Sequence, residues 1–462
     1  MLAKFKKKYI GDWDFYQKYL LLAIPMILQN AITNLVSFLD NIMVGQLGTE
    51  QMSGVAIVNQ LIFVYNLAIF GAVSAASIFG AQYFGKGNHK GHMYSFRFKL
   101  YATLLVTGGA ILLFLTKGSA LISLYLTDTV GNGATDLALQ YGLEYLAIMM
   151  VGLIPFAVNQ SYATNIKETG QTFIPMLASF VAVGTNAILD YLMIFGIGPF
   201  PELGVQGAAL ATVIARYIEA LIVVIWAHIH RGKNRYLEGA YTGFGIPLAE
   251  LKAILIKGFP LMMNEVLWAA GMTTVTQCYS VRGLDVVAGL NIASTITNLF
   301  NIVYLQLGSC ISIVVGQYLG AGKLEDAKDA DNKMIVFSVF CCVIMAALMF
   351  VVGGFFPGIY NTTEVIRELA TSFIAVSAII MPFCAFSHAS YFTLRSGGKT
   401  VVTFLFDSVF TWVIVVPAAY LLAHFTGLGI VSIYFLVQGT ELIKVIIGYL
   451  MVKSNVWVVQ MV

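Results

Sequence analysis

"AQYFGKG", residues Ala81 to Gly87, returns 235 positions later as "GQYLGAG", residues Gly316 to Gly322. The same offset pairs Pro25 with Pro260 and runs without a gap up to the repeated segment. Scattered glycine matches are expected by chance in an apolar chain, but a long register that includes two prolines is not. The repeat therefore indicates an internal duplication, in which the two halves of the chain adopt the same fold.

The composition indicates that this fold lies in a lipid bilayer. Of the 462 residues, 59% are hydrophobic and only 11% are charged, which is typical of a membrane protein. Apolar segments near twenty residues recur from end to end, each long enough to cross a hydrocarbon core of roughly 30 Å. We predict an all-α polytopic membrane protein with twelve transmembrane helices, at residues 16–43, 52–83, 94–116, 137–162, 171–196, 204–229, 251–279, 287–317, 334–356, 368–393, 401–423 and 429–452.

Each half of the chain holds six of these spans. An even number returns the chain to the same side of the membrane, so the halves are parallel repeats related by a pseudo-twofold axis along the membrane normal. A second repeated segment, "KETGQT" from Lys167 and "RSGGKT" from Arg395, has an offset slightly shorter than 235 residues, as loops of different length would produce. We predict two six-helix bundles, an N-lobe at 1–229 and a C-lobe at 251–462, joined by a cytoplasmic linker at 230–250. A ligand cleft between two such lobes is typical of transporters.

The distribution of Lys and Arg predicts the orientation. The N-terminal side begins with a basic cluster at Lys4, Lys6, Lys7 and Lys8. The same side collects nearly all later basic residues, Lys99 among them, whereas the other side has only Lys117, Arg282 and Arg367. By the positive-inside rule both termini are cytoplasmic, in a protein integral to the cell membrane. The net charge of +3 is thus a topology signal, and we expect no nucleic-acid partner.

Other function classes lack their sequence signals. No Walker loop or Gly-rich strand-to-helix turn is present, so we expect no ATP binding. The cysteines have no metal-binding or redox spacing, and we expect no cofactor. An intramembrane acyl or glycosyl transferase stays an alternative, but it would need a polar catalytic cluster in a substantial loop, and these loops are mostly short. We therefore expect a protein that is not an enzyme.

Acidic residues inside the spans carry the functional signal. An ionised side chain at the centre of a membrane helix raises the free energy of insertion by roughly 2.5–3.5 kcal/mol. We therefore expect each such residue to have an opposite charge nearby or a role in function. Two acids have a basic residue at i, i+3 and can be neutralised locally, in the pairs Arg216 with Glu219 and Glu441 with Lys444. Four have no opposite charge three or four residues away, namely Asp40, Asp190, Glu265 and Asp407.

Asp40 and Asp190 form the leading candidate site. Each lies shortly before the glycine that ends its apolar run, roughly 7–9 Å inside the outer end of its helix. Asn186 precedes Asp190 by one helical turn on the same face and adds an uncharged amide. Burial disfavours a carboxylate and two neighbouring acids repel each other, so such a pair can bind a proton or Na⁺ near neutral pH. The alternative is a buried carboxyl that stabilises the N-lobe through hydrogen bonds.

Three stretches carry a family resemblance: "SFLDNIMVGQLG", "NAILDYLMIFGIGPFPELGVQGAALAT" and the repeated "QYxGxG". They resemble the multidrug and toxic compound extrusion (MATE) transporters, and the resemblance covers essentially the whole chain. It implies a central cleft and cation-coupled efflux of organic, often cationic, molecules. It also implies that Asp40, Asp190 and Asn186 belong to an N-lobe cation site. Further candidates for this site, where ordinary packing is the alternative role, are Tyr145, Asn159 and Thr212.

A possible second coupling or substrate site lies in the C-lobe. One branch of the family has a functional acid in the seventh helix, which Glu265 matches at a somewhat different distance from the proline. Asp407 lies near the cytoplasmic end of its span, where snorkelling or helix capping is the alternative. The acid of that branch in the tenth span is absent, and His388 is the ionisable residue there, which puts a C-lobe Na⁺ site in doubt.

Two further sets complete the prediction. Pro25 and Pro260 each remove a backbone hydrogen bond and permit a bend in the first and seventh spans. A cleft wall suited to flat cations could include Trp268, Met262 and Met263, although most such residues face lipid.

The predicted function is secondary active antiport. We expect export of small organic, cationic drugs or toxic metabolites in exchange for H⁺ or Na⁺, by alternating access, in a monomer within the lipid bilayer. A lipid-linked oligosaccharide flippase is the alternative transporter, which would favour basic cleft residues to hold a pyrophosphate, whereas the unpaired charges here are acidic.

Overall fold

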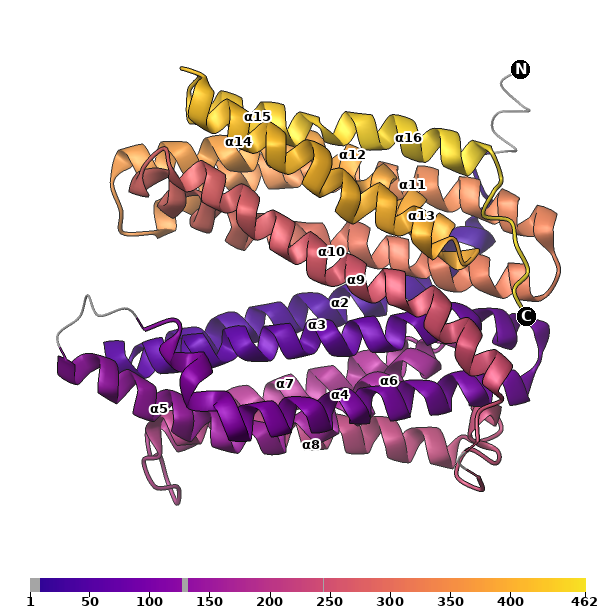
Figure 1. The fold of residues 1–462 in the computed structure, drawn as a ribbon, viewed down its shortest axis with the longest axis horizontal. Coiled ribbons are helices and arrows are strands. Elements are labelled where there is room, and N and C mark those ends of the chain that lie inside the picture. The colour runs from indigo at the N-terminus through magenta and orange to yellow at the C-terminus, as the bar shows by residue number, and fades with distance from the viewer. Residues whose placement is uncertain (1–8, 127–131, 244) are drawn as a thin grey trace. The chain divides into compact units, whose positions relative to one another are not determined.

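The computed structural model describes residues 9–126, 132–243 and 245–462, and within its helices it leaves out the side chains of 36–38 and 132–134. The basic cluster at Lys4, Lys6, Lys7 and Lys8 lies outside the described residues. The described chain is almost entirely helical, and the long helices within each half run beside one another (Figure 1). In the first half they are α2 (Trp13–Gly45), α3 (Thr49–Lys86), α4 (His89–Ser123), α5 (Asn132–Val151), α6 (Leu153–Glu168), α7 (Phe173–Ile194) and α8 (Gly204–Ile229).

The second half repeats this pattern after the short turn η1 (Arg235–Leu237). Its helices are α9 (Leu248–Ser280), α10 (Leu284–Gly320), α11 (Leu324–Gly353), α12 (Glu364–Ser396), α13 (Thr400–Phe404), α14 (Val416–Phe425), α15 (Ile430–Gly439) and α16 (Glu441–Lys453). Shorter turns are η2 (Phe356–Ile359), η3 (Leu405–Val409) and η4 (Thr411–Val415). Among the described residues, 11 helices are long and apolar enough to span a membrane, or 12 when one bent pair counts as a single span. The prediction of an all-α protein with twelve spans, six in each half, is confirmed.

The bent pair is the fourth span, which was predicted as one helix at 137–162. Its two parts, Thr135–Val151 and Leu153–Glu168, meet at an angle of 44°. Gly152 lies at the break, and Pro155 follows in the first turn of α6. Proline has no N–H to donate to the carbonyl four residues earlier, which is that of Val151, so the hydrogen-bond ladder is interrupted at this point.

The eleventh span is also irregular. Between α13 and α14, the turns η3 and η4 are wider π-helical turns. Pro417 follows them at the start of α14, and its missing N–H removes one regular hydrogen bond of the span. Wide turns of this kind often occur at functional positions in membrane helices. Here they include the candidate residue Asp407.

By packing, the described chain forms two compact units. Unit 1 contains Lys252–Val462, the segment Ala81–Asn88 and the start of the chain up to Ala23. Unit 2 contains Ile24–Gly80 and His89–Leu251. The division into an N-lobe at 1–229, a linker and a C-lobe at 251–462 stays a prediction.

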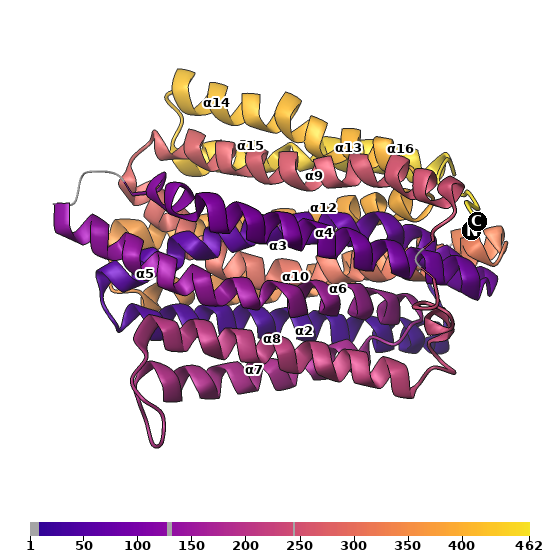
Figure 2. The same ribbon diagram turned by 60° about the horizontal axis from the view of Figure 1, so that its bottom comes forward.

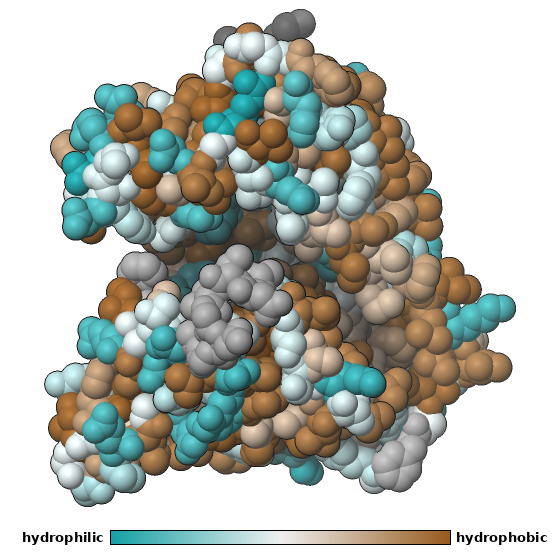
Figure 3. All heavy atoms as spheres, turned by 60° about the vertical axis from the view of Figure 1, so that its left-hand side comes forward, coloured by the Kyte–Doolittle hydropathy of each residue, from teal (hydrophilic) through white to brown (hydrophobic). Residues whose placement is uncertain are grey.

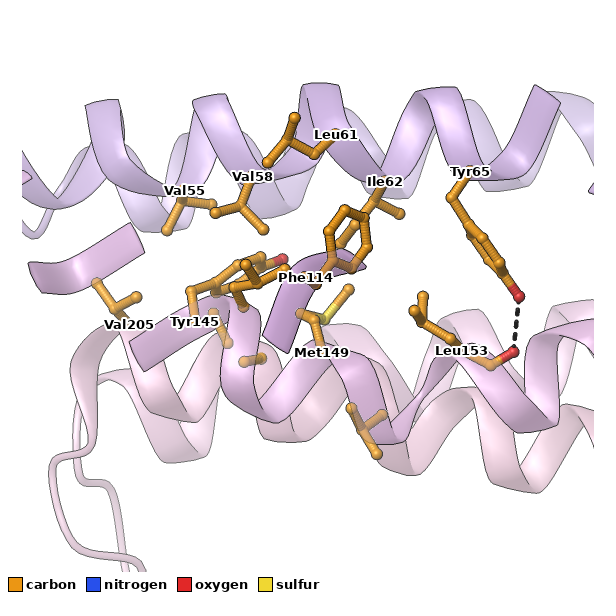
Figure 4. Packing of buried hydrophobic residues seen from close by; sticks show 14 of the residues in the cluster. Val55, Val58, Leu61, Ile62, Tyr65, Phe114, Tyr145, Met149, Leu153 and Val205 are labelled. Atoms are coloured by element: carbon orange, nitrogen blue, oxygen red, sulfur yellow. Dashed lines mark hydrogen bonds between the residues drawn. The ribbon is translucent and has the colours of Figure 1, made fainter. Parts of the chain in front are cut away.

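Within unit 2, α7 and α8 form the most extensive helix pair and lie side by side in Figure 2. The core lies where α3, α4, α5 and α8 meet, and Figure 4 shows Val55, Val58 and Ile62 of α3 facing Tyr145 and Met149 of α5. Small residues permit such close crossings in membranes. A Cβ on Gly54 would lie 2.5 Å from the carbonyl oxygen of Ala138 in α5.

Unit 1 has an equivalent core formed by α9, α10, α11 and α12 with the last two spans. The repeated segments meet here, because Gly320 of α10 packs directly on the backbone of Gln82 in α3. The Gln82 amide donates to the carbonyl oxygen of Ser396 at 2.9 Å, and its Oε1 accepts from the backbone N–H of Met461 at 2.8 Å. The repeated "QYxGxG" segment is therefore a close helix contact that also fixes the C-terminal segment.

The outer surface of each unit is strongly apolar. Large hydrophobic side chains such as Leu105, Phe180 and Phe340 are more than half exposed. In Figure 3 hydrophobic residues, shown in brown, cover much of the visible surface. Exposed apolar surface of this extent is stable against lipid and not against water, and the protein is an integral membrane protein.

Candidate functional site

Unit 2 brings Asp40 of α2 and Asp190 of α7 together. Asp190 is 1% exposed, and its carboxyl group lies within hydrogen-bonding reach of the half-buried Asp40 carboxyl. By geometry, no donor in the described part of the chain bonds either oxygen of Asp190 or Oδ1 of Asp40. Two carboxyl groups approach this closely only when a proton or a cation is shared between them. The pair is therefore suited to bind one.

The residues around the pair come from three further helices. Asn186 lies beside Asp190 on α7, and its amide donates to the hydroxyl group of Thr212 on α8 at 3.4 Å. Tyr145 of α5 lies near both carboxyl groups, and its hydroxyl donates to Oδ1 of Asn59 on α3 at 3.3 Å. Figure 4 shows the Tyr145 ring packed in the apolar core, with the hydroxyl group at its edge. These groups place amide and hydroxyl oxygens around two unbonded carboxyl groups.

The glycine-rich loop after Asp190 explains how the chain presents this site. Gly196 and Gly204 have positive φ angles of 66° and 53°, a conformation that other residues rarely adopt. The loop returns close to the end of α7, where the N–H of Leu203 donates to the carbonyl oxygen of Met193 at 2.9 Å. The motif glycines therefore make the tight connection that holds α8, with Thr212, against α7, with Asp190.

Asn159 lies apart from this site, in a second polar group of unit 2. It is 2% exposed and lies beside Glu219 of α8. Glu219 accepts a hydrogen bond from Ser179 of α7, which in turn accepts one from the amide of Gln29 at 2.7 Å. Sequence reasoning missed Gln29 and Ser179, because uncharged residues give no strong signal in an apolar helix.

The expected ion pair between Arg216 and Glu219 is absent from the described residues. The Arg216 guanidinium instead lies 5.1 Å from the centre of the Phe156 ring and donates weakly to the carbonyl oxygen of Gly152 at 3.4 Å. The bend between α5 and α6 supplies this carbonyl, since a helix break leaves backbone acceptors free. The spacing of residues along α8 could not predict that Arg216 bonds a backbone carbonyl between α5 and α6.

In unit 1, Asp407 does not snorkel toward the membrane surface. Its side chain is 17% exposed, and it pairs with the Lys444 ammonium of α16 at 3.0 Å. Asn264 of α9 donates to its other oxygen at 3.1 Å. Asn264 also accepts from the hydroxyl of Ser408, with its side-chain oxygen at 2.7 Å, which ties α9 to the wide turn η3. The i, i+3 pair of Lys444 with Glu441 is present but longer, at 4.0 Å.

Glu265 and His388 lie near this ion pair. Glu265 is half-buried and lies close to Arg395 and Asp407. His388 of α12 has Nδ1 3.0 Å from the carbonyl oxygen of Cys384 and lies near Lys444 and Asp407. The structure therefore brings all three candidates of the possible second site together, around a lysine that sequence spacing had assigned to Glu441 alone.

The remaining candidates lie on α9 and α2. Met262 and Trp268 are 38% and 39% exposed and Met263 is half-buried, so all three have surface for a ligand or lipid. Pro25 and Pro260 lie inside the uninterrupted helices α2 and α9. The boundary between the units falls between Ala23 and Ile24, next to Pro25, and the predicted bends stay predictions.

A buried charged cluster in unit 2 was also missed. Lys99 of α4 is fully buried and donates to Asn165 and Glu168 of α6. His92 of α4 lies 3.3 Å from the other Glu168 oxygen. Lys99 was counted with the basic residues of the cytoplasmic side, and its position near a helix end gave no sign that it is buried. In the described residues no group of three or more His, Cys, Asp or Glu side chains could hold a metal ion.

Comparisons with known proteins agree with this fold. The MatE family model matches residues 25–192 and 260–421, one match in each half of the chain. A probable multidrug resistance protein NorM from Thermotoga maritima is 23% identical over 89% of this chain and 86% of its own length. A protein of the same name from Halalkalibacterium halodurans is 24% identical over 89% and 88%. Among solved structures, an outward-facing multidrug resistance MATE family transporter of the MOP superfamily has a TM-score of 0.86, at 20% identity over 96% of each chain.

Proposed function

Because the chain belongs to the MatE family of multidrug and toxic compound extrusion transporters, we propose that it is a secondary antiporter that exports small organic molecules in exchange for H⁺ or Na⁺. The names of its relatives support multidrug efflux as its role. The family match does not favour the oligosaccharide flippase. We place the protein in the cell membrane with both termini in the cytoplasm, acting as a transporter and not as an enzyme.

One observation carries the proposal of ion coupling. Asp190 is almost fully buried beside Asp40, and in the described residues no donor reaches either of its oxygens with good hydrogen-bond geometry. A buried ionised carboxylate without donors costs several kcal/mol, so the empty pair is unfavourable. A proton or Na⁺ removes this cost. The pair therefore acts as the site of the coupling ion, with the Asn186 amide and the Thr212 hydroxyl as neutral ligands.

Filling this site changes the balance between conformations. The ion binds between α2 and α7, so the helices are held together when it is bound and repelled when it leaves. A ligand can shift a conformational equilibrium only by its difference in affinity for the two states, and this local change in charge provides such a difference. Substrate and ion then favour opposite states, and by linkage each weakens the binding of the other.

The test uses purified protein in lipid vesicles that contain a fluorescent organic cation. Efflux should require an inward gradient of H⁺ or Na⁺ and should not respond to ATP. Asp190→Asn should abolish gradient-driven efflux while the protein folds normally, because the amide is neutral and cannot exchange an ion. The matched control is Asp136→Asn, the same change at an exposed acid on α5, which should transport normally.

Two results would refute the proposal. Transport powered by ATP alone would exclude antiport. Unchanged ion dependence in Asp190→Asn would make Asp190 a structural residue and move the coupling site elsewhere in the chain.

A further inference from the structure

The later spans of the two halves can be compared through the repeated segment that aligns Lys167 with Arg395. This register places Asp407 at the position of Ser179. The earlier offset of 235 residues places Asn264 at the position of Gln29. Both alignments hold in space, because Gln29 contacts Ser179 at 2.7 Å and Asn264 contacts Asp407 at 3.1 Å. The two halves therefore share a polar contact whose charge differs.

The same register places Lys444 at the position of Arg216. Each half thus has one buried or half-buried cation at this position, but only unit 1 has an aspartate facing it. Arg216 has a ring and a backbone carbonyl as its closest contacts, whereas Lys444 makes a 3.0 Å ion pair with Asp407. The second half therefore has a carboxylate beside this cation, and the first half has a serine at the same position.

The surroundings of Lys444 form a binding site for an ammonium group. Its side chain is 8% exposed, with the Asp407 and Glu441 carboxylates at 3.0 Å and 4.0 Å. The rings of Phe406 and Phe410 lie 5.4 Å and 5.9 Å from Nζ, in the range of cation–π contacts. Carboxylates and aromatic faces are the groups that proteins use to bind ammonium ions. Among the described residues, other ionisable groups nearby are His388 and Cys384, and Glu265 lies beside Asp407 and Arg395.

We propose that Lys444 is a built-in cation, whose ammonium group permanently fills an acidic ammonium-binding site in unit 1 that would otherwise take a small monovalent cation. A tethered group binds intramolecularly, at an effective concentration in roughly the millimolar range or above, and here two carboxylates and two rings hold it against free cations. Asp407 is then not a coupling acid, and the Asp40–Asp190 pair is the exchangeable ion site. The proposal rests on the proposed function for its consequence, and its first test does not depend on transport.

The first experiment removes the Lys444 side chain and adds a free amine in its place. Lys444→Ala deletes the ammonium group and leaves space for a free amine among the two carboxylates and two rings. Ethylammonium chloride should raise the unfolding temperature of purified Lys444→Ala by several degrees, in a saturable way, because it binds only the folded state. The unmodified protein should show no such shift, and neither should Lys444→Ala combined with Asp407→Asn. Tetramethylammonium chloride controls for ionic strength.

A folded Lys444→Ala that gives the same shift with ethylammonium and tetramethylammonium would overturn the proposal, as would an ethylammonium shift that persists with Asp407→Asn. If Lys444→Ala does not fold, a second experiment measures the binding of H⁺ or Na⁺ to purified protein with Lys444 in place. Binding of the coupling ion should then be lost completely in Asp190→Asn. Residual ion binding in Asp190→Asn that Asp407→Asn removes would show that the unit 1 site exchanges ions, and would overturn the proposal even though antiport itself could still be correct.

Discussion

The buried cluster around Lys99 allows a prediction about stability that is independent of transport. Lys99 is fully buried and Glu168 is 2% exposed, and the lysine donates to both Glu168 and Asn165. Lys99→Met keeps the length of the side chain but leaves the Glu168 carboxylate buried without its ammonium partner. Removal of one partner from a buried ion pair typically costs about 3–5 kcal/mol. For folding units of 150–250 residues, each kcal/mol lowers the unfolding temperature by roughly 2–4 °C, so we expect a decrease of roughly 6–20 °C.

The assay is thermal unfolding of detergent-purified protein followed by tryptophan fluorescence. Lys90→Met is the matched control, because Lys90 is exposed on the same helix and its loss should change stability by no more than about 0.5 kcal/mol. Lys99→Met combined with Glu168→Gln should recover most of the loss, since an uncharged pair carries little of the desolvation cost. A decrease below about 2 °C in Lys99→Met, or a double variant whose losses simply add, would refute the assignment of a coupled buried pair.

Three further predictions concern transport and packing. Asp40→Asn should abolish gradient-driven efflux from vesicles, and wild-type ion dependence in this variant would exclude Asp40 from the coupling pair. Gly320→Val should lower the unfolding temperature strongly, because a side chain there overlaps the Gln82 backbone, and an unchanged melting curve would contradict this contact. Pro25→Ala should restore one backbone hydrogen bond of α2 and weaken ion coupling while the protein stays inserted, which an efflux assay at several gradients measures, whereas the same change at the repeat partner Pro260 tests whether both bends matter.

The spans could be predicted from the sequence because the bilayer imposes their length and apolarity on every helix. What this signal cannot resolve is a break inside an apolar run. The stretch around Gly152 and Pro155 is as hydrophobic as its neighbours, so it was counted in one span although it bends by 44°. The wide turns before Pro417 escaped notice for the same reason. In both places a proline marks the irregularity, and its missing N–H is the physical cause.

Charged residues were predictable to different degrees. Asp40 and Asp190 stood out because each is an isolated acid at a similar depth, and the structure brings them together. Asp407 stood out for the same reason, but its partner lies 37 residues away on another helix, beyond any rule based on spacing. Lys99 was not recognised as a buried charge, because a lysine near a helix end normally reaches water. Isolation of a charge in the sequence thus identifies residues that need a partner, and only the fold can identify which partner.

The duplication explains why partners decide function here. Two halves with the same helices have equivalent positions at which a charged residue can stand. We therefore expect the halves to differ in function through which of their acids have a basic partner. In unit 1 the acid at the repeated contact, Asp407, has a lysine at 3.0 Å that balances its charge. In unit 2 the equivalent position is the neutral Ser179, which donates to Glu219, and the candidate coupling acids are Asp40 and Asp190, for which the described residues show no ion pair with a basic side chain. In the proposed mechanism the uncompensated pair of unit 2 exchanges a cation and the compensated acid of unit 1 does not, so one half would couple transport to an ion while the other holds its charge constant.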